Sequence, residues 1–259
     1  MIEELIAILN DFNCVGLSDL DNVRFMNRID TKFILPVGQV PDLLEIMKGN
    51  YNVLEINGSK ILGYHTTYFD TTDYLFFNQH VTGRAERNKV RIRYYLSTGT
   101  TFLEVKRRTK KNRTIKWRIE RHNSDLPFDE RAINFLTSYV PDVAGDLKPT
   151  LFNDFSRITF AGIRNPERVT IDLNLSFKTT DGDIWEIPYL AIAELKSDGI
   201  AYRSDFGKLT RQLSNHPAGF SKYCLGNALL LDIPRKNILK SKLLLLNKLE
   251  NDYKSSLHA

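Results

Sequence analysis

The sequence is poor in cysteine and has no long apolar run, and these shortages exclude several classes of protein. Only two of its 259 residues are cysteines, Cys14 and Cys224. Their separation fits no zinc or redox motif, so we expect two idle thiols in a reducing compartment. No run of 18 apolar residues occurs, and the acidic N-terminal residues MIEEL lack the cationic start of a signal peptide. We therefore expect a cytoplasmic protein without a membrane span.

The composition is that of an ordinary folded domain. Apolar residues make up 42% and charged residues 26% of the chain, with 14 glycines and 9 prolines. These values exclude a disordered or collagen-like chain. No repeat, low-complexity tract or linker-like segment occurs, so we expect one domain over residues 1–259. The net charge of +5 is too small to indicate a nucleic-acid partner, and we expect none.

Hydrophobic periodicity predicts a few helices around many strands. Apolar residues recur at helical spacing in 2–12, 41–48 and 129–139, and in a C-terminal segment of about 236–255 whose clearest part is 238–253. Segments rich in Val, Ile, Thr, Tyr and Phe alternate at period two and predict strands. They lie near 26–35, 61–69, 88–96, 101–109, 114–121, 155–161, 167–177, 184–187 and 191–196. One α+β domain built on an antiparallel sheet or barrel is the simplest interpretation.

The positive charge of the chain is concentrated on one face of these strands. Residues i, i+2 and i+4 of a strand share a face, so each segment divides into an apolar and a polar side. The polar sides carry eleven cations, Arg28, Lys32, Arg91, Arg93, Lys106, Arg108, Lys116, Arg118, Arg157, Arg168 and Lys196. They carry five anions, Asp30, Glu104, Glu120, Asp172 and Glu194, and alternation also places Asn174 and Ser176 there. The rest of the chain is nearly neutral.

This charged face has two interpretations, and alternation alone leaves both open. It faces bulk water, as in many antiparallel sheets, or helices cover the apolar side and turn the charges inward. Like charges about 4 Å apart repel by about 4 kcal/mol at an effective dielectric constant near 20, so an inward face needs an anionic occupant. Arginine and lysine suit phosphate. The few carboxylates suit Mg²⁺ or Mn²⁺, which takes one or two carboxylates plus phosphate oxygens.

Eight short segments, in order over about residues 24–226, resemble the polyphosphate polymerase (VTC) domain family of the triphosphate tunnel metalloenzyme superfamily. The segments are RIDTKF (28–33), TYFDT (67–71), KVRIRYY (89–95), FLEVKR (102–107), FSR (155–157), RVTID (168–172), AELK (193–196) and SKY (221–223). The resemblance implies an eight-stranded antiparallel β-barrel tunnel with a charged interior, flanked by helices. Eukaryotic members of the family carry an N-terminal inositol-phosphate-sensing domain and C-terminal membrane helices, which we do not expect in a chain of this length.

The resemblance also implies roles for individual residues. Matched cations would contact phosphates: Lys32, Arg91, Arg93, Lys106, Lys116, Arg157, Arg168 and Lys222. The charged face adds Arg28, Arg108, Arg118 and Lys196 to the phosphate-binding set. Glu194 would hold Mn²⁺ or Mg²⁺, with Asp172 and Glu104 as further metal or cation-orienting candidates. We expect the reaction to depend most on Arg91, Arg93, Lys106, Arg157, Arg168 and Glu194. Asp70 is better explained as a capping carboxylate at a strand end, and His80 as a satisfied polar residue.

The implied reaction transfers the γ-phosphate of ATP to a polyphosphate chain and releases ADP. ATP and inorganic polyphosphate or triphosphate are then the expected partners. Metal-dependent hydrolysis of tripolyphosphate or a nucleoside triphosphate is the first alternative, and non-catalytic polyphosphate binding is the second. The first strand reads RIDTK instead of the two-glutamate-and-lysine signature of hydrolytic relatives, which favours the polymerase.

Overall fold

The structure is a computed structural model that describes residues 1–21, 29–111, 113–121, 128–233 and 235–257. The described helices are α1 (Ile2–Leu9), α2 (Leu17–Asp21), α3 (Val40–Met47), α4 (Leu75–Val81), α5 (Glu130–Tyr139), α6 (Asp205–Gln212), α7 (Lys222–Leu230) and α8 (Lys240–Leu257). Four short 3₁₀ turns are η1 (Val37–Gln39), η2 (Pro141–Val143), η3 (Ala201–Arg203) and η4 (Lys236–Leu239). The strands are β1 (Cys14–Val15), β2 (Ile29–Pro36), β3 (Tyr51–Leu54), β4 (Leu62–Asp70), β5 (Arg87–Tyr95), β6 (Thr100–Arg108), β7 (Thr114–Arg121), β8 (Lys148–Gly162), β9 (Arg168–Lys178), β10 (Ile184–Ile187) and β11 (Leu190–Ser197).

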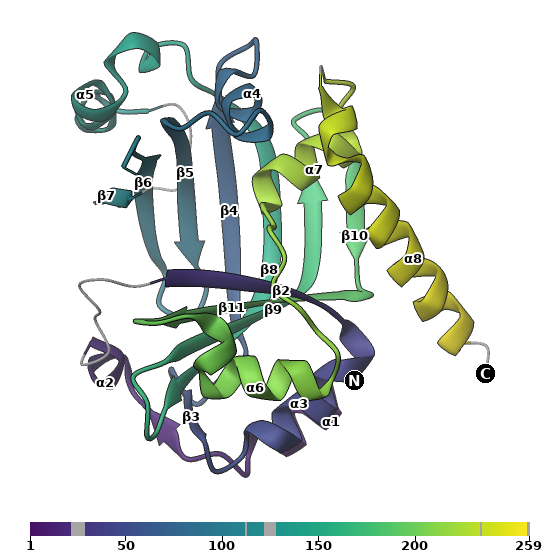
Figure 1. The fold of residues 1–259 in the computed structure, drawn as a ribbon. Helices are drawn as coiled ribbons and strands as arrows, with labels where there is room; N and C mark the ends of the chain where they lie inside the picture. Colours follow the sequence, from purple (N-terminus) through teal and green to yellow (C-terminus); the bar gives the residue numbers. More distant parts are fainter. Residues whose placement is uncertain (22–28, 112, 122–127, 234, 258–259) are drawn as a thin grey trace.

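Eight strands form one curved antiparallel sheet in the order β2-β11-β9-β8-β4-β5-β6-β7. β3 and β10 extend it beside β8 and β9, and β1 pairs with β3. β2 and β7 end the path, and no described pair of residues joins them by a strand ladder. In Figure 1 the sheet bends so that β2 and β11 cross in front of the long strands β4 to β6. The predicted α+β tunnel is confirmed, as a barrel-like sheet that hydrogen bonds do not close.

Helices cover the outer side of the β2–β11–β9–β8 half of the sheet. Leu43 of α3 and Phe206 of α6 belong to one fully buried apolar cluster with Ile171 of β9 and Ala193 of β11. Figure 1 shows α1, α3 and α6 together beneath this part of the sheet. Apolar side chains of these strands therefore point outward into a helical layer. Their charged neighbours in sequence point to the inside, which is the second of the two interpretations that alternation left open.

The predicted helices over 2–12, 41–48, 129–139 and 238–253 correspond to α1, α3, α5 and α8, with shifted ends. Helices α2, α4, α6 and α7 were not predicted. Helix α7 is buried at six consecutive positions, 223–228, so its sequence KYCLGNALL has no apolar stripe to reveal it. The strand predicted near 155–161 begins at Lys148 in the structure. No described helix has the length and apolarity that crossing a bilayer requires.

One predicted face is wrong in the second half of β9. In the register of β8 with β9, Asp154 pairs with Ser176, and the next pair is Ser156 with Leu173. A bulge therefore leaves one residue of β8, Phe155, opposite two residues of β9, Asn174 and Leu175. Asn174 adopts a left-handed conformation with φ of 50°, which is typical of a bulged position. The extra residue reverses the alternation beyond it. Asn174 and Ser176 therefore do not share the face of Asp172, as strict period two had predicted.

Candidate functional site

Helix α7 closes one side of the tunnel, and a buried carboxylate fixes it there. Asp70, at the end of β4, accepts hydrogen bonds from the backbone N–H groups of Phe76 and Phe77 at the start of α4, at 2.8 and 2.9 Å. Its side chain also accepts a hydrogen bond from the hydroxyl of Tyr223 on α7. The carboxyl is fully buried, and burial raises its pKa above the ordinary value. The expected capping role of Asp70 is confirmed, and the cap ties α4 and α7 to the sheet.

The two residues before Tyr223 carry polar groups from α7 to the tunnel. Ser221 is the N-cap of α7, and its Oγ accepts a hydrogen bond from the N–H of Cys224 at 3.2 Å. The same oxygen accepts from the ammonium of Lys89 on β5 at 2.9 Å. Lys222 points the other way, to Asp172 on β9, with its Nζ 2.7 Å from Oδ2. The segment SKY therefore makes three different contacts in the interior.

Glu104 forms the first of three groups in which a carboxylate lies among cations. It is 1% exposed on β6. The Nε of Arg91, on β5, donates to its Oε2 at 2.7 Å, and the ammonium of Lys116, on β7, forms an ion pair with its Oε1. Burial alone would raise the pKa of Glu104, but Arg91, Arg93 and Lys116 hold that pKa well below the usual range. Glu104 is therefore ionised, and it orients two of the predicted phosphate-binding cations.

Asp172 forms the second group. Arg157, on β8, donates to both carboxylate oxygens of Asp172, at 2.5 Å from Nε and 2.8 Å from Nη2. This bidentate pairing fixes the plane of the guanidinium. Burial opposes the charge of Asp172, but Arg157 and Lys222 keep the pKa of Asp172 well below its usual range. The ammonium of Lys222 also lies over the ring of Phe155.

Glu194, on β11, forms the third and most open group. It forms an ion pair with Lys196 on the same strand, and its Oε2 lies 3.6 Å from the ammonium of Lys32 on β2. Lys196 also lies 3.5 Å from Asp30. Burial would raise the pKa of Glu194, but Lys196 and Lys32 lower it well below the ordinary value. At 23% exposure, Glu194 is the most accessible of the three carboxylates.

Four further predicted cations lie elsewhere on the strands or outside the described residues. Arg93 donates weakly to Thr66 at 3.4 Å, and its guanidinium lies over the ring of Tyr64. Arg118 stacks over Phe102, 4.5 Å from the ring centre, at a more exposed position of the interior face. Arg168 lies opposite Lys196 in the register of β9 and β11. Arg28 lies outside the described residues.

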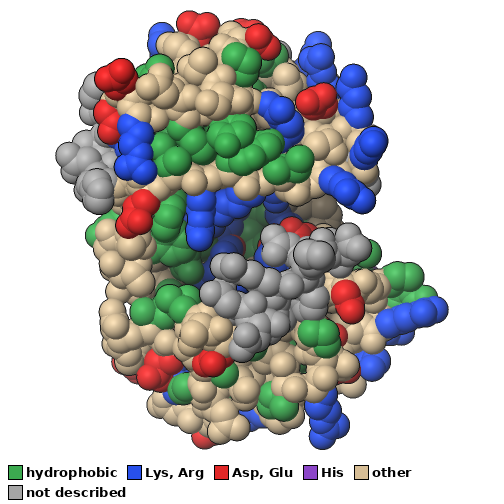
Figure 2. Space-filling view, turned by 90° about the vertical axis from the view of Figure 1, so that its left-hand side faces the viewer, with side chains coloured by type: hydrophobic (Ala, Val, Ile, Leu, Met, Phe, Trp, Pro, Cys, Tyr) green, Lys and Arg blue, Asp and Glu red, His purple; other side chains and the backbone are tan. Residues whose placement is uncertain are grey.

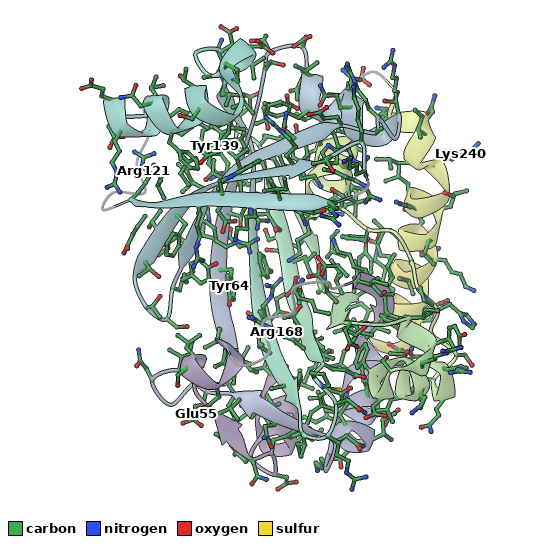
Figure 3. All side chains as sticks on the ribbon, turned by 60° about the vertical axis from the view of Figure 1, so that its left-hand side comes forward. Glu55, Tyr64, Arg121, Tyr139, Arg168 and Lys240 are labelled. Atoms are coloured by element: carbon green, nitrogen blue, oxygen red, sulfur yellow. The ribbon has the colours of Figure 1, made fainter. Side chains whose placement is uncertain are left out.

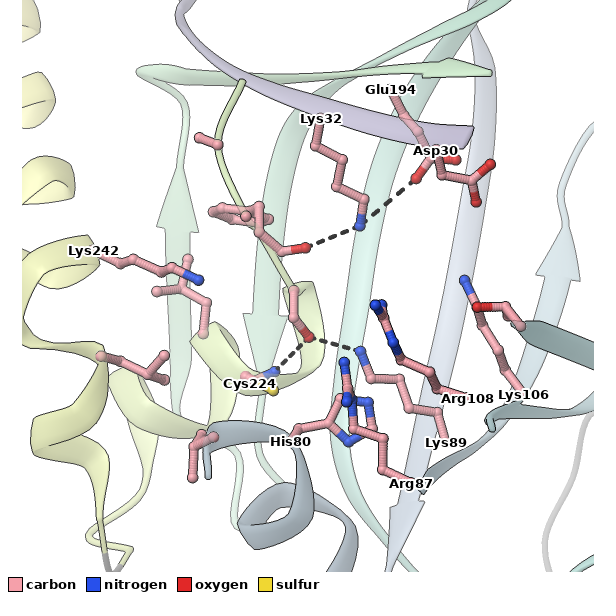
Figure 4. A pocket seen from close by; sticks show the side chains of 18 of the residues that line it. Asp30, Lys32, His80, Arg87, Lys89, Lys106, Arg108, Glu194, Cys224 and Lys242 are labelled. Carbon is pink, nitrogen blue, oxygen red and sulfur yellow. Dashed lines mark hydrogen bonds and ion pairs between the residues drawn. The ribbon is translucent and has the colours of Figure 1, made fainter. Parts of the chain in front are cut away.

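A cavity of about 470 Å³ opens between these groups and α7. Of the predicted residues, Lys32, Lys106, Arg108 and Glu194 line it. Figure 2 shows Lys and Arg side chains gathered inside a hollow on one side of the molecule, and Figure 4 shows Lys32 and Glu194 facing Lys89, Lys106 and Arg108 across it. Burial, with repulsion from neighbouring cations, lowers the pKa of Lys89 to about 7, and burial lowers that of Lys106 to about 8. The surroundings of both lysines therefore disfavour their charged forms.

Sequence reasoning gave no role in the site to four residues that line this cavity, Lys89, Arg87, His80 and Lys242. Lys89 and Arg87 continue the alternation of Arg91 and Arg93 toward the start of β5, so extending that pattern by four residues would have found them. His80 is neutral, because burial and Lys89 hold its pKa well below the usual range. Its Nδ1 lies 2.9 Å from the carbonyl oxygen of Phe76, which agrees with the predicted role of a satisfied polar residue. No sequence pattern linked Lys242 to the site, because α8 lies far from the strands along the chain.

The residues at Glu194 fit a divalent cation that takes most of its ligands from the substrate. No described group of three or more His, Cys, Asp or Glu residues could enclose a metal ion. Mg²⁺ and Mn²⁺, however, accept one or two carboxylates and complete their shells with water and phosphate oxygens. Glu194 faces the cavity, with Asp30 nearby. Glu104 and Asp172 fit less well, since their side chains are only 1% and 6% exposed and neither lines the cavity.

Comparison with known proteins adds a family and a fold. The sequence model of a family described as the VTC domain matches residues 27–231. No protein of curated function matches the chain. A candidate adenylate cyclase of Bacillus halodurans is 12% identical, covers 76% of this chain and 94% of its own, and superposes with a TM-score of 0.50.

Two other solved structures are also similar. A Hippeastrum protein described as a candidate adenylyl cyclase with a dominant triphosphatase activity is 14% identical, with a TM-score of 0.46, and covers 80% of this chain and 98% of its own. A candidate adenylate cyclase of Vibrio parahaemolyticus is 12% identical, with a TM-score of 0.45, and covers 77% of this chain and 97% of its own. At such identities the likeness bears on the fold alone.

Proposed function

This chain belongs to the VTC domain family, and from that premise we propose that it is an ATP-dependent polyphosphate polymerase. The reaction would transfer the γ-phosphate of ATP to the end of a polyphosphate chain inside the tunnel. The observation that carries the proposal is the inward-facing set of cations. Arg91, Arg157 and Lys222 are each held by a buried carboxylate on the interior face, and Lys32, Lys106 and Arg108 line the cavity beside them.

The arrangement suits phosphoryl transfer because that reaction needs positioning and charge stabilisation more than a side-chain nucleophile. A terminal oxygen of the acceptor chain attacks the γ-phosphorus of ATP and forms a new P–O bond. The bond from that phosphorus to the bridging β–γ oxygen breaks, and ADP leaves with the electron pair. No atom of the protein enters the covalent steps. Arg91, Arg93 and Arg157 would stabilise the equatorial oxygens, and Lys32, Lys106 and Lys222 would bind the flanking phosphates.

Glu194 would hold the divalent cation, and such an ion neutralises charge on the transferring phosphate when it is bound. Lys196 and Lys32 now contact this carboxylate, so the ion and its phosphate ligands would take over their places. We assign Glu104 and Asp172 a positioning role, since each has a nearly inaccessible side chain that contacts two cations. Arg168, Lys116, Arg118 and Lys196 are secondary candidates for phosphate contact.

The decisive experiment resolves the products of purified protein with ATP and Mn²⁺ or Mg²⁺. Phosphate chains that lengthen with time, together with stoichiometric ADP, are the expected result. Free phosphate without chains would show a hydrolase in the same tunnel. Stabilisation by polyphosphate without turnover would show a binding module. Either of these two results would overturn the proposal.

Glu194→Gln tests the metal assignment. The substitution removes the charge while keeping the shape of the side chain, so we expect metal-dependent turnover to fall by a factor of at least about 100, with the melting temperature little changed. Glu186→Gln, on the exposed strand β10, is the matched control and should retain full activity. Undiminished metal-dependent activity in Glu194→Gln would show that Glu194 is not the ligand.

A further inference from the structure

Two buried threonines, Thr159 on β8 and Thr170 on β9, lie opposite each other on the interior face of the sheet. They are 1% and 2% exposed. Their sequence neighbours Ile158 and Ile171 belong to the outer apolar cluster with α3 and α6, so alternation turns the threonines inward. In Figure 3, Arg168, two residues earlier on the same face of β9, lies toward the middle of the molecule. Among the described residues, neither threonine hydroxyl has a hydrogen-bond partner.

An unpaired buried hydroxyl is unfavourable, because it has given up its hydrogen bonds to water and gained none in return. Strand packing does not require this hydroxyl, since valine has the same branched shape and suits a strand as well as threonine does. The packing of the fold therefore does not explain the hydroxyls of Thr159 and Thr170. A group of this kind points to a partner that the protein acquires when it binds an ion or a ligand.

Of the two threonines, Thr170 is the one that lies next to the carboxylate assigned to the metal. It is opposite Glu194 in the register of β9 and β11, whereas Thr159 is one strand farther away. Opposite residues on neighbouring strands have Cβ atoms about 5 Å apart, so the longer side chain of Glu194 can bring an oxygen to the hydroxyl of Thr170. On its other side, Glu194 lies opposite Lys32 of β2. The carboxylate thus stands between a cation and a neutral hydroxyl.

A carboxylate that binds a cation needs a second partner to hold its orientation. The oxygens of Glu194 contact Lys196 and Lys32, and under the proposed function the ion and its phosphates take the places of these lysines. A carboxylate that gives one oxygen to the ion keeps the other for a hydrogen-bond donor, which fixes the orientation of the ligand. A neutral hydroxyl suits this role better than an ammonium, because it leaves the negative charge of the carboxylate to the cation.

We propose that Thr170 is a positioning residue for the divalent cation, and that its hydroxyl donates a hydrogen bond to the Glu194 oxygen that is not bonded to the ion. The inference rests on the proposed function and adds to it the residue that orients the metal ligand. Because Thr170 acts through Glu194, its loss changes how strongly the ion binds and leaves the phosphate-binding cations in place. Since the hydroxyl has no other described partner, its removal does not weaken the fold.

The test measures how much Mn²⁺ strengthens the binding of the non-hydrolysable β,γ-imido analogue of ATP to the full chain. Calorimetry gives the affinity for this analogue in saturating Mn²⁺ and, separately, in a chelator. We expect Thr170→Val to weaken binding of the Mn²⁺ complex about tenfold and to change metal-free binding less than about twofold. Thr170→Ser keeps the hydroxyl and should restore nearly the wild-type affinity for the Mn²⁺ complex.

Thr159→Val is the matched control, because Thr159 has the same residue type, face and burial but does not lie opposite Glu194. It should change neither affinity. Both valine variants should keep or raise the melting temperature, since each removes a buried hydroxyl without a described partner. A lower melting temperature in Thr170→Val, with no change in the gain from Mn²⁺, would assign its hydroxyl to the fold instead of the metal.

The outcomes separate this inference from the proposed function. If Thr170→Val leaves the affinity for the Mn²⁺ complex unchanged, or weakens binding equally with and without metal, the positioning role is refuted while nucleotide binding in the tunnel stands. An equal loss in Thr159→Val refutes it as well. If Mn²⁺ does not strengthen binding to the wild-type protein, the metal assignment of the proposed function fails, and this inference fails with it.

Discussion

Glu104 shows how a single buried residue supports a cationic interior. Its carboxylate contacts Arg91 and Lys116 and also lowers the electrostatic cost of Arg93. A carboxylate that is 1% exposed would be unfavourable alone, and three neighbouring cations would be unfavourable without it. Asp172 has the same relation to Arg157 and Lys222. These anions hold the cations in position on the interior face.

Glu104→Gln should therefore destabilise the ligand-free protein. Breaking a buried ion pair from one side costs about 3 kcal/mol or more, because the partner charges stay behind. A saturating amount of polyphosphate should recover part of this loss, since it supplies anions to the same cations. Urea unfolding measures both quantities.

Glu120→Gln is the control, because Glu120 of β7 lies on the same face of the sheet as Glu104 but at an exposed position. It should change the free energy of unfolding by no more than about 0.5 kcal/mol. Equal effects from the two substitutions would mean that Glu104 does not compensate the interior cations.

Lys89 predicts a proton uptake that accompanies phosphate binding. Burial lowers its pKa to about 7 from an ordinary 10.5. Between these values the unfolded chain holds a proton that the folded protein lacks, so this residue makes the ligand-free protein more stable as pH rises from about 7 to about 10. A bound polyanion raises the pKa of Lys89 again. At pH 8 we therefore expect binding of tripolyphosphate to take up close to one proton at Lys89.

Calorimetric titration in two buffers with different ionisation enthalpies measures this uptake. The ligand and the other cations also exchange protons, and Lys89→Met isolates the contribution of Lys89 as a difference. The variant should take up fewer protons than the wild type. The same uptake in both proteins would show that Lys89 does not change its charge on binding.

At the scale of elements, α7 connects stability to the site. Its first turn supplies Ser221 and Lys222 to the interior, and Tyr223 bonds to Asp70 beneath it. Further along the helix, Gly226 lies directly against the sheet. A Cβ at that position would stand 2.6 Å from both Leu151 and Phe177. The close approach keeps the start of the helix, and with it Lys222, against Asp172.

Gly226→Ala should move α7 away from the sheet. Overpacking of this kind costs about 1–3 kcal/mol, and the displaced Ser221 and Lys222 should reduce tripolyphosphate affinity as well. Gly145→Ala is the matched control, since a Cβ there meets no atom within 4 Å. Thermal unfolding and binding are measured on both variants. Loss of stability with full affinity would show that α7 does not position the site.

The elements also show what sequence reasoning could find. The polar faces of β5, β6 and β7 followed from period two, because each strand has one side toward the tunnel and one toward helices or solvent. The reversal in β9 did not follow, since the bulge at Asn174 depends on pairing with β8. Helix α7 gave no periodic signal because it is buried on all sides, and Lys222 was found only through the resemblance of the segment SKY.

At the scale of the whole molecule, the modest net charge of +5 conceals a strong internal separation. The tunnel face holds most of the excess cations, while the side of the molecule seen in Figure 2 carries charges of both signs around the hollow. Alternation alone could not decide whether that face met water or the interior of a barrel. The helical layer of α1, α3 and α6 decides it, because it buries the opposite side of the strands. The absence of a nucleic-acid partner stays a prediction.

The most direct measurement is a crystal structure with tripolyphosphate and Mn²⁺, in which anomalous scattering locates the ion. The account predicts phosphates between Lys32 on one wall and Arg91 and Lys106 on the other, with Mn²⁺ bonded to Glu194 and to phosphate oxygens. Phosphates found only on the outer surface, with the interior ion pairs of Glu104, Asp172 and Glu194 unchanged, would contradict it.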